Sequence, residues 1–397
     1  MIQPAPHIAN VKYAIRNIAV EASRLEAQGK KILYCNVGDP LKFDFQTPPH
    51  LLEAVEKAMR DGKNGYAPSL GIPQARAAVA RRLNAEGHAR VTPDDVVLTA
   101  GASEAIDLTL TSLLEPGDEV LLPSPGYPLY NAIAARLSAR VSSYQLDEAR
   151  GWAIDTDELE RLVTKRTRAV VICNPNNPTG ALLTKENLLE VIDFARRHQL
   201  ALLSDEIYDK LLFDDAHTPT ATLADDVPII TFNGLSKAYL ACGWRVGWLS
   251  FGNPKLTQDV AAAVRRLADA RLCGPAPVQY AVEPALFGPQ DHIPAMMKKL
   301  RARRDLMVRA IREIPGVSVV EPKAAFYAMP KLELPNLKSD EDFVIRLVRE
   351  TGVLFVHGEG FGQAPGTHHV RVVYLPDEAT LKDAFARFGD FVRRWQG

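Results

Sequence analysis

Three polar side chains that could act together in catalysis stand where apolar segments of the chain end. Asn177, Asp205 and Lys237 follow one another at intervals of 28 residues (177 to 205) and 32 residues (205 to 237). An amide can donate and accept hydrogen bonds, a buried carboxylate needs a positive partner, and an amine among apolar neighbours can act as a nucleophile. Because the carboxyl ends of parallel strands meet at one edge of a sheet, we expect these side chains to converge there.

A second group of residues is suited to binding an anion such as phosphate. The segment TAGASEAIDL places Gly101, Ala102 and Ser103 at the start of an amphipathic helix, where small residues expose N–H groups and the positive end of the helix dipole. Arg245 follows Lys237 by eight residues and can donate paired hydrogen bonds to phosphate oxygens. Each feature alone also has an ordinary structural explanation, as a turn, a salt-bridged acid or a surface lysine.

Together, the acid, the amine, the amide and the anion site describe a pyridoxal phosphate site. In such a site Asp205 would keep the pyridine nitrogen protonated, so that the ring accepts electrons, and Lys237 would form a Schiff base with the aldehyde. Pyridoxal 5'-phosphate is therefore the predicted cofactor. The four cysteines lie far apart and form no Cys/His cluster at metal-ligand spacing, so no metal is predicted.

Six short apolar segments, separated by helical patterns, would position these residues. They lie at 95–99, 118–123, 168–175, 200–206, 228–234 and 246–251. Stretches of helical periodicity stand between them, as at 103–118 and 184–199. This alternation predicts an α/β fold in which helices cover both faces of a mostly parallel sheet.

The pattern changes near residue 290, which predicts a second unit. A long basic helical stretch at 292–316 is followed by apolar runs at 317–322, 324–330, 353–357 and 368–375 and by helical patterns at 340–350 and 377–395. We therefore predict a large cofactor-binding domain at 46–290 and a smaller α+β domain at 291–397. Residues 1–45 are too few to form a domain alone, and we expect an amino-terminal arm and part of the small domain there.

Composition argues against several classes of protein. The 397 residues are 47% hydrophobic and 24% charged, as in soluble globular proteins, which argues against disordered and fibrous folds. A net charge of -1 lacks the basic excess of nucleic-acid-binding proteins, and no apolar segment approaches the ~20 residues of a membrane span. The first residues show no leader pattern, so a cytoplasmic protein is expected.

Over nearly its whole length the sequence resembles fold type I aminotransferases of classes I and II, the aspartate aminotransferase superfamily. The motifs that carry this resemblance are NVGDP, GYAPSLG, TAGASEAI, PSPGYPLY, NPNNPTG, SDEIYD, GLSKAYLACGWRVG and HHVRVVYL. The implied cofactor contacts are Ala102, Ser103 and Arg245 at the phosphate, Tyr127 stacked on the ring, and Asn177 and Tyr208 at its phenolic oxygen. Lys237, Asp205 and Tyr208 would be the catalytic residues.

The resemblance also implies a homodimer with two shared active sites. Tyr66, in GYAPSLG, would reach the phosphate in the partner subunit, or else be an interface or core aromatic. Arg371 would bind the α-carboxylate of the substrate, assisted by Gly38 and Asn177. Many relatives carry a serine three residues before the lysine, where this chain has Gly234, so Ser236 or a backbone amide would replace one phosphate donor.

Within the family, the sequence is most similar to bacterial glutamate-pyruvate (alanine) aminotransferases. The strings EIYDKLLFDDA, ITFNGLSKAY and RLCGPAPVQYAVEPAL carry this similarity. In that branch the amino-terminal segment folds over the site, so Tyr13 and Arg16 would contact the substrate or else pack against the small domain. The implied reaction converts L-alanine and 2-oxoglutarate to pyruvate and L-glutamate with ping-pong kinetics.

Other activities stay open on the same scaffold. Aspartate would require a second arginine for its distal carboxylate, and Arg271 lies near the corresponding stretch without aligning well; aromatic amino acids are a further alternative. A pyridoxal-phosphate-dependent C–S β-lyase would use the same Lys237 and Asp205, and a non-catalytic pyridoxal phosphate sensor is the remaining alternative. The loop GEGFGQAPG at 358–366 has a flexible composition but lacks the spacing of a phosphate loop.

Overall fold

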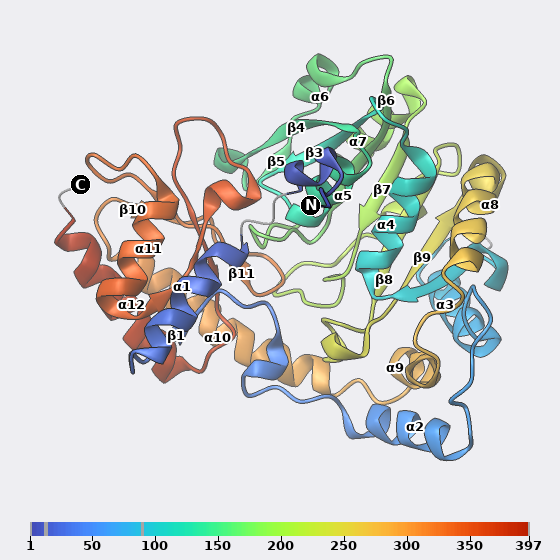
Figure 1. Ribbon diagram of the computed structural model, residues 1–397, viewed down its shortest axis with the longest axis horizontal. Coiled ribbons are helices and arrows are strands. Elements are labelled where there is room, and N and C mark those ends of the chain that lie inside the picture. Colours follow the sequence, from blue (N-terminus) through green and yellow to red (C-terminus); the bar gives the residue numbers. More distant parts are fainter. Residues whose placement is uncertain (1, 12–14, 89–90, 396–397) are drawn as a thin grey trace.

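The largest element of the protein is a central sheet of eight strands (Figure 1). A computed structural model describes residues 2–11, 15–88 and 91–395, without the side chains of residues 15–17. In spatial order the strands are β2 (Val96–Ala100), β9 (Val246–Gly252), β8 (Ile229–Gly234), β7 (Ala201–Asp205), β6 (Thr167–Cys173), β3 (Glu119–Ser124), β4 (Arg140–Asp147) and β5 (Ala153–Ile154). The strands from β8 to β4 run parallel, whereas β9 is antiparallel to both of its neighbours and β5 is antiparallel to β4. The predicted α/β fold with a mostly parallel sheet is therefore confirmed.

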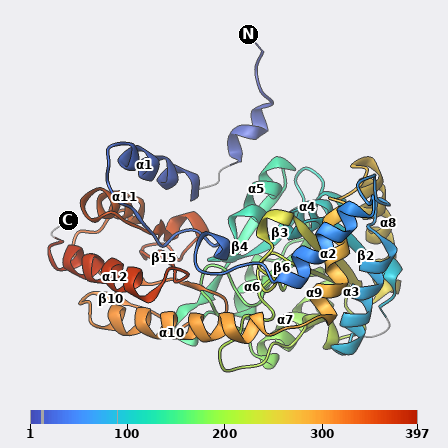
Figure 2. The same ribbon diagram turned by 90° about the horizontal axis from the view of Figure 1, so that it is seen from below.

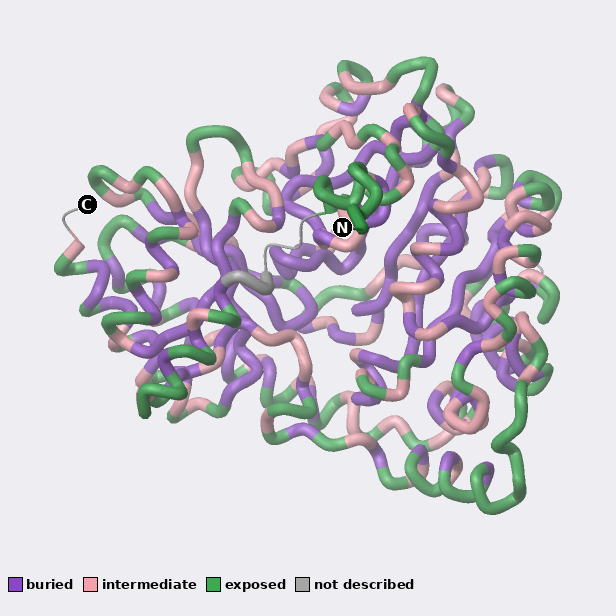
Figure 3. The backbone as a smooth tube through the Cα atoms, in the orientation of Figure 1, coloured by how far each residue is buried: buried purple, intermediate pink, exposed green. Residues whose placement is uncertain are grey.

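Helices cover both faces of this sheet. On one face lie α4 (Ala102–Leu113), α5 (Pro128–Arg136) and α8 (Pro254–Ala270). On the other face lie α6 (Thr156–Leu162) and α7 (Lys185–His198). Neighbouring residues of a strand point to opposite faces, so Val171 joins the first core cluster and Val170 the second. Because both faces are covered, the central strands are buried along most of their length (Figure 3).

Three further helices pack together beyond the β2 edge of the sheet. They are α2 (Pro49–Arg60), α3 (Pro73–Ala85) and α9 (Val282–Phe287). α3 packs on β2 and on α9, and its apolar residues join the same core cluster as Val96 and Leu98. Helix α3 thus covers β2 directly, and α9 packs on α3 and on α2.

The carboxy-terminal part of the chain contains three helices and several short strands. The helices are α10 (His292–Arg312), α11 (Asp340–Thr351) and α12 (Glu378–Arg393). The strands are β10 (Val317–Ser318), β11 (Tyr327–Ala328), β12 (Lys331–Leu332), β13 (Val353–Leu354), β14 (Val356–His357) and β15 (Val370–Val373). β15 lies between β11 and β14 in an antiparallel sheet. Figure 2 shows this part at one end of the molecule, with α10 extending from it toward the large sheet.

The amino-terminal segment contacts both parts of the molecule. β1 (Leu33–Tyr34) pairs in parallel with β13, and α1 (Ile15–Ala27) packs against α11. The short 3-10 helix Pro6–Asn10 lies instead against α5 of the large unit. The domain boundaries at 45/46 and 290/291 stay predictions. The contacts of β1 and α1 are those expected for an arm that joins the smaller part, whereas the contact of Pro6–Asn10 with α5 is not.

Aromatic residues dominate the core of the carboxy-terminal part. The ring of Phe343 on α11 lies 6.3 Å from that of Phe388 and 5.3 Å from that of Phe391, both on α12. Edge-to-face contacts of this kind add to the stabilisation that the buried area provides. The apolar faces of these helices therefore pack against one another.

Among the described helices, none is both long and apolar enough to cross a membrane.

Candidate active site

A cavity of about 380 Å³ lies where the carboxyl ends of the parallel strands face the smaller part. The predicted residues that line it are Gly38, Ala102, Ser103, Tyr127, Asn177, Asp205, Tyr208, Ser236, Lys237, Arg245 and Arg371. They come from the amino-terminal segment, the large sheet and β15. The expected convergence at one rim of the sheet is therefore what the structure shows.

Asp205 ends β7 and is almost completely buried, with 3% of its surface exposed. Burial raises the pKa of Asp205 to about 6, because the ionised carboxylate loses its hydration. The N–H of Ile207 and the hydroxyl of Tyr130 oppose this rise by donating hydrogen bonds to the carboxylate over 3.3 and 3.2 Å. The acid thus stands in a position where a cationic ring nitrogen would restore its charged form.

Lys237 follows β8 and points its amine at the amino-terminal segment. Its Nζ donates a hydrogen bond of 2.8 Å to the carbonyl oxygen of Gly38. The rings of Tyr208 and Phe326 lie 5.9 and 5.7 Å from the nitrogen. Within the described residues no carboxylate forms an ion pair with this amine, which leaves it available for reaction with an aldehyde.

The start of α4 and Arg245 form a cradle for an anion. Gly101 precedes the helix with a φ of 76°, and Ala102 and Ser103 form its first turn. The Arg245 guanidinium donates hydrogen bonds of 2.9 Å to the Cys242 carbonyl and 3.3 Å to the Ala100 carbonyl. Any Cβ on Gly101 would overlap this guanidinium, so glycine permits both the turn and the close approach. A phosphate would meet N–H groups, the positive end of the helix dipole and a full positive charge here.

The structure gives a reason for glycine at position 234, where many relatives carry serine. A Cβ on Gly234 would lie 2.7 Å from the carbonyl oxygen of Val246 and 2.9 Å from the Cα of Gly247. Both atoms belong to the backbone of β9, which would have to move. Ser236 lines the cavity and stays the candidate for the missing hydroxyl.

Arg371 and Asn177 meet on the substrate side of the cavity. Arg371 is carried by β15, with 4% of its surface exposed, and its Nη1 lies 3.3 Å from the amide oxygen of Asn177. Its Nη2 donates a hydrogen bond of 2.6 Å to the Asn36 carbonyl. The rings of Phe361 and Tyr327 lie 4.5 and 5.0 Å from the guanidinium carbon. These contacts hold a planar cation at the cavity wall, and such a group is suited to binding a carboxylate.

Some residues of the site are not among those that the sequence predicts. Tyr327 lines the cavity and shares a hydrogen bond of 3.0 Å between hydroxyl groups with Tyr208. Asn36 and Tyr130 contact Arg371 and Asp205, as described above. Asn36 opens the motif NVGDP and could have been found there, whereas the apolar run around Tyr327 gave no signal beyond that of a core strand.

Gly101 precedes α4 and does not itself line the cavity. Four other residues named from the sequence lie outside the cavity or have side chains that the structure does not describe. Tyr66 is 83% exposed, and Tyr13 lies outside the described residues. Arg16 belongs to α1, but its side chain is not described; Ala19 of the same helix lines the cavity. Arg271 donates hydrogen bonds to the carbonyls of Ser69 and Leu98 over 3.0 and 2.8 Å, so it joins a turn to strand β2 within its own chain.

The residues of this cavity fit the group that the resemblance implies. A buried acid, an amine that forms no ion pair among the described residues, and an anion cradle match the ring nitrogen, the aldehyde and the phosphate of pyridoxal phosphate. Comparisons with known proteins point the same way.

A sequence profile of the family "Aminotransferase class I and II" matches residues 30–388. The chain is similar to "Alanine aminotransferase" of Mycobacterium tuberculosis, with 42% identity over 97% of this chain and 91% of that protein. It is 38% identical to "Glutamate-pyruvate aminotransferase AlaA" of Escherichia coli over 98% of both chains. A solved structure of alanine aminotransferase from Pyrococcus furiosus superposes with a TM-score of 0.97 and 41% identity, covering 99% of this chain and 100% of that one. The chain therefore belongs to the class I and II aminotransferases, enzymes that move an amino group between amino acids and 2-oxo acids.

Proposed function

We propose that this chain catalyses pyridoxal-phosphate-dependent amino transfer from L-alanine to 2-oxoglutarate, with pyruvate and L-glutamate as products. The observation that carries the proposal is one cavity that unites the amine of Lys237, the buried acid Asp205 and the Arg371–Asn177 pair. Support for alanine comes from relatives that are named for alanine or glutamate-pyruvate and match almost the full chain.

The chain's own residues would hold the cofactor in place. Gly101, Ala102, Ser103, Ser236 and Arg245 would bind the phosphate, Tyr127 would stack on the ring, Asn177 and Tyr208 would bind the phenolic oxygen, and Asp205 would bind the ring nitrogen. When bound, pyridoxal phosphate supplies an aldehyde that takes up the amino group and a ring that withdraws electrons from the substrate Cα.

Protein groups would then position the substrate and move its proton. Arg371 and Asn177, with the backbone at Gly38, bind the α-carboxylate and fix the direction of the Cα–H bond. The Nζ of Lys237 would take the proton from the Cα of the amino donor and, in the second half-reaction, would give a proton to the Cα that derives from the 2-oxo acid. The hydrogen bond between Tyr208 and Tyr327 would keep the tyrosine side of the cavity in place while the proton moves.

Several further assignments belong to the same proposal. The protein acts as a homodimer in which Tyr66, exposed in the single chain, reaches the phosphate of the partner subunit. Tyr13 and Arg16 contact the substrate, which is supported by Ala19 of α1 at the cavity wall. A cytoplasmic location is supported by four cysteines that all stay unpaired, as expected in a reducing compartment.

The visible spectrum of the purified protein with pyridoxal phosphate tests the proposal directly. We expect a visible band of the bound cofactor that bleaches on addition of L-alanine and returns on addition of 2-oxoglutarate. A band that alanine leaves unchanged, but that aspartate or tyrosine bleaches, would overturn the choice of substrate and keep the aminotransferase. Release of pyruvate and ammonia from cystathionine would indicate a β-lyase instead.

Replacing Lys237 by Ala separates cofactor binding from catalysis. We expect the variant to retain the cofactor through the phosphate cradle and the ring contacts, and transamination to fall at least about 10³-fold because proton transfer at Cα is lost. Lys185→Ala, which removes an exposed lysine at the start of α7, is the matched control and should keep full activity. Retained turnover in Lys237→Ala would defeat the assignment.

A further inference from the structure

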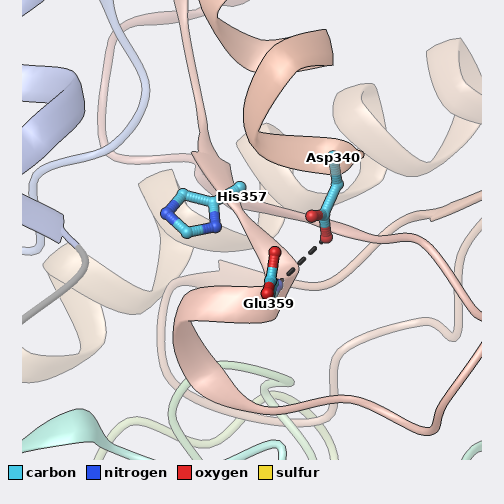
Figure 4. A group of neighbouring side chains, drawn as sticks. All are labelled: Asp340, His357 and Glu359. Carbon is cyan, nitrogen blue, oxygen red and sulfur yellow. Dashed lines mark hydrogen bonds between the residues drawn. The ribbon is translucent and has the colours of Figure 1, made fainter. Parts of the chain in front are cut away.

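A cluster of potential metal ligands lies in the smaller part of the molecule, apart from the cavity described above. Asp340 is the first residue of α11, His357 ends β14, and Glu359 follows in the 3-10 helix Gly358–Phe361 (Figure 4). One ligand atom from each side chain lies within 4.8 Å of the other two. Residues 340 and 357 are distant in sequence, which is why Cys and His spacing gave no sign of this group.

His357 is the residue in this cluster that ordinary packing leaves unexplained. It is 4% exposed, and neither of its ring nitrogens has a hydrogen-bond partner among the described residues. A buried polar group without a partner costs free energy, and buried histidines almost always donate or accept through at least one nitrogen. Figure 4 shows the ring beside the two carboxylates, with one nitrogen turned toward Glu359.

The two carboxylates lack cationic partners as well. Asp340, with 1% of its surface exposed, accepts hydrogen bonds of 3.0 Å from the N–H of Glu359 and 2.9 Å from the amide of Gln363, both through Oδ2. Within the described chain, neither Asp340 nor Glu359 forms an ion pair with a lysine, arginine or histidine. Two neighbouring carboxylates repel each other, so a cation between them would lower the energy of both.

Further polar contacts hold one of the buried ligands, Asp340, in place. Gln363 donates to Asp340 through its amide and contacts Nδ1 of His369 over 3.0 Å through its oxygen. Nε2 of His369 lies 3.3 Å from a carboxylate oxygen of Glu148 in the large unit. Outer contacts of this kind orient metal ligands and are typical of metal sites in proteins.

We propose that Asp340, His357 and Glu359 form a binding site for one divalent transition-metal ion, with Zn²⁺ as the best fit. One imidazole and two carboxylates are ligands that zinc takes, and water would fill the remaining position on the exposed side of Glu359. In a tetrahedral site with bonds of about 2.0–2.2 Å, an ion holds two ligand atoms roughly 3.3–3.6 Å apart, closer than the 4.8 Å within which these three atoms lie. The side chains therefore have to move toward one another on binding, and the exposed Glu359 has the most room to rotate.

A bound ion would join three elements close to the substrate arginine. It would tie α11 and β14 to the 3-10 helix that carries Phe361, whose ring lies against the Arg371 guanidinium. The carbonyl oxygen of Phe361 also accepts a hydrogen bond of 2.7 Å from the N–H of Gly126, beside Tyr127. The site is therefore structural, and it would act on the cavity only by holding Phe361 in place.

Zinc binding by the full-length holoenzyme tests the proposal. After treatment with a chelator, we expect the protein to take up one Zn²⁺ per chain in competition with a chromophoric zinc indicator. In Glu359→Gln, which changes an exposed side chain and leaves the fold intact, the affinity should fall at least about tenfold. His357→Asn, with its fold checked by circular dichroism, should abolish binding at this site.

Asp342→Asn is the matched control, because it removes an exposed acid on the same helix outside the cluster. It should bind zinc as the unchanged protein does. Cobalt(II) provides a second readout, since its visible ligand-field bands should appear in the unchanged protein and be lost in His357→Asn. Equal zinc affinity in all variants would place the ion elsewhere and overturn the proposal, as would failure to bind zinc at micromolar concentration.

Discussion

Asp205 is a buried acid that lowers the stability of the cofactor-free protein when it is ionised. Burial raises the pKa of this acid from its ordinary value of 3.8 to about 6. Between these two values the folded chain binds a proton that the unfolded chain has already released. Stability is therefore lost as pH rises from about 4 to 6, and the loss persists above that range.

Asp205→Asn should consequently stabilise the cofactor-free protein at alkaline pH. A shift of this size corresponds to about 3 kcal/mol in the free energy of unfolding at pH 8, and to almost nothing at about pH 4. Urea unfolding of both proteins at the two pH values measures this difference. The same substitution should weaken cofactor binding, because the neutral amide cannot pair with a protonated ring. A stability gain that is independent of pH would contradict the electrostatic explanation.

Substrate binding should depend on the planar shape of the Arg371 guanidinium as well as on its positive charge. Arg371→Lys keeps the cation but loses the planar fork that is anchored on Asn177 and the Asn36 carbonyl. We expect kcat/KM for L-alanine to fall about 10–100-fold, mainly through KM, while the cofactor band stays unchanged. Arg312→Lys on α10, far from the cavity, should leave all parameters unaltered. A loss confined to kcat would instead place Arg371 in the chemical step.

At the scale of elements, the turn before α4 allows backbone strain to be separated from loss of the phosphate site. Gly101 and Gly151 have similar φ values of 76° and 71°, but only at Gly101 would a Cβ meet the Arg245 guanidinium. Around Gly151 nothing lies within 4 Å of that position. Gly151 has a ψ of 30° and is left-handed, so alanine there costs about 1 kcal/mol in the free energy of unfolding. Gly101 has a ψ of 168°, a conformation that almost only glycine adopts, and alanine there costs up to about 3 kcal/mol.

Gly101→Ala should in addition displace Arg245 and weaken pyridoxal phosphate binding at least about tenfold, the loss expected when one charged hydrogen bond is broken. Titration of the visible cofactor band gives this affinity. Gly151→Ala should show only the lowered stability. If both variants lost affinity to the same degree, general destabilisation would be the cause and the role of Arg245 would be disproved.

The elements that the sequence predicted well are those with an unambiguous pattern. All six expected strands of the large sheet are present, because both faces of these strands are covered and their sequences are continuous apolar runs. β4, with the sequence RVSSYQLD, was missed because mainly Tyr144 and Leu146 are buried in it. The apolar run at 353–357 reads as one segment, but it divides at Phe355 between two different sheets.

The same reasoning explains which site residues could be found. Asp205 and Lys237 stand at strand ends, where the topology alone brings them together. Tyr130 lies within α5 and has the appearance of a core aromatic until the structure places its hydroxyl against Asp205. His357 is a comparable case, because its neighbours Asp340 and Glu359 meet it only after three elements have packed. Contacts of this kind depend on tertiary packing, which a local pattern does not contain.

At the scale of the whole molecule, one buried arginine connects distant parts of the chain. Arg303 on α10 is 1% exposed, and its guanidinium donates hydrogen bonds to both carboxylate oxygens of Asp44 and to the carbonyl of Leu375. It thereby joins the end of the amino-terminal segment to the carboxy-terminal part. The segment that carries Gly38 is fixed in this way against the lysine that it contacts.

The proposed homodimer can be tested by restoring activity in dimers that are mixed from two inactive or weakened chains. If each site combines Lys237 of one chain with Tyr66 of the other, a dimer of one Lys237→Ala chain and one Tyr66→Phe chain has one intact site and one doubly defective site. Lys237→Ala alone should be inactive, and Tyr66→Phe alone should require more pyridoxal phosphate. After the two are mixed in equal amounts under conditions of subunit exchange, half of the dimers are mixed, so about a quarter of all sites are restored. Activity at limiting cofactor should rise to that level, whereas a Tyr66 that served its own chain would give no rise at all.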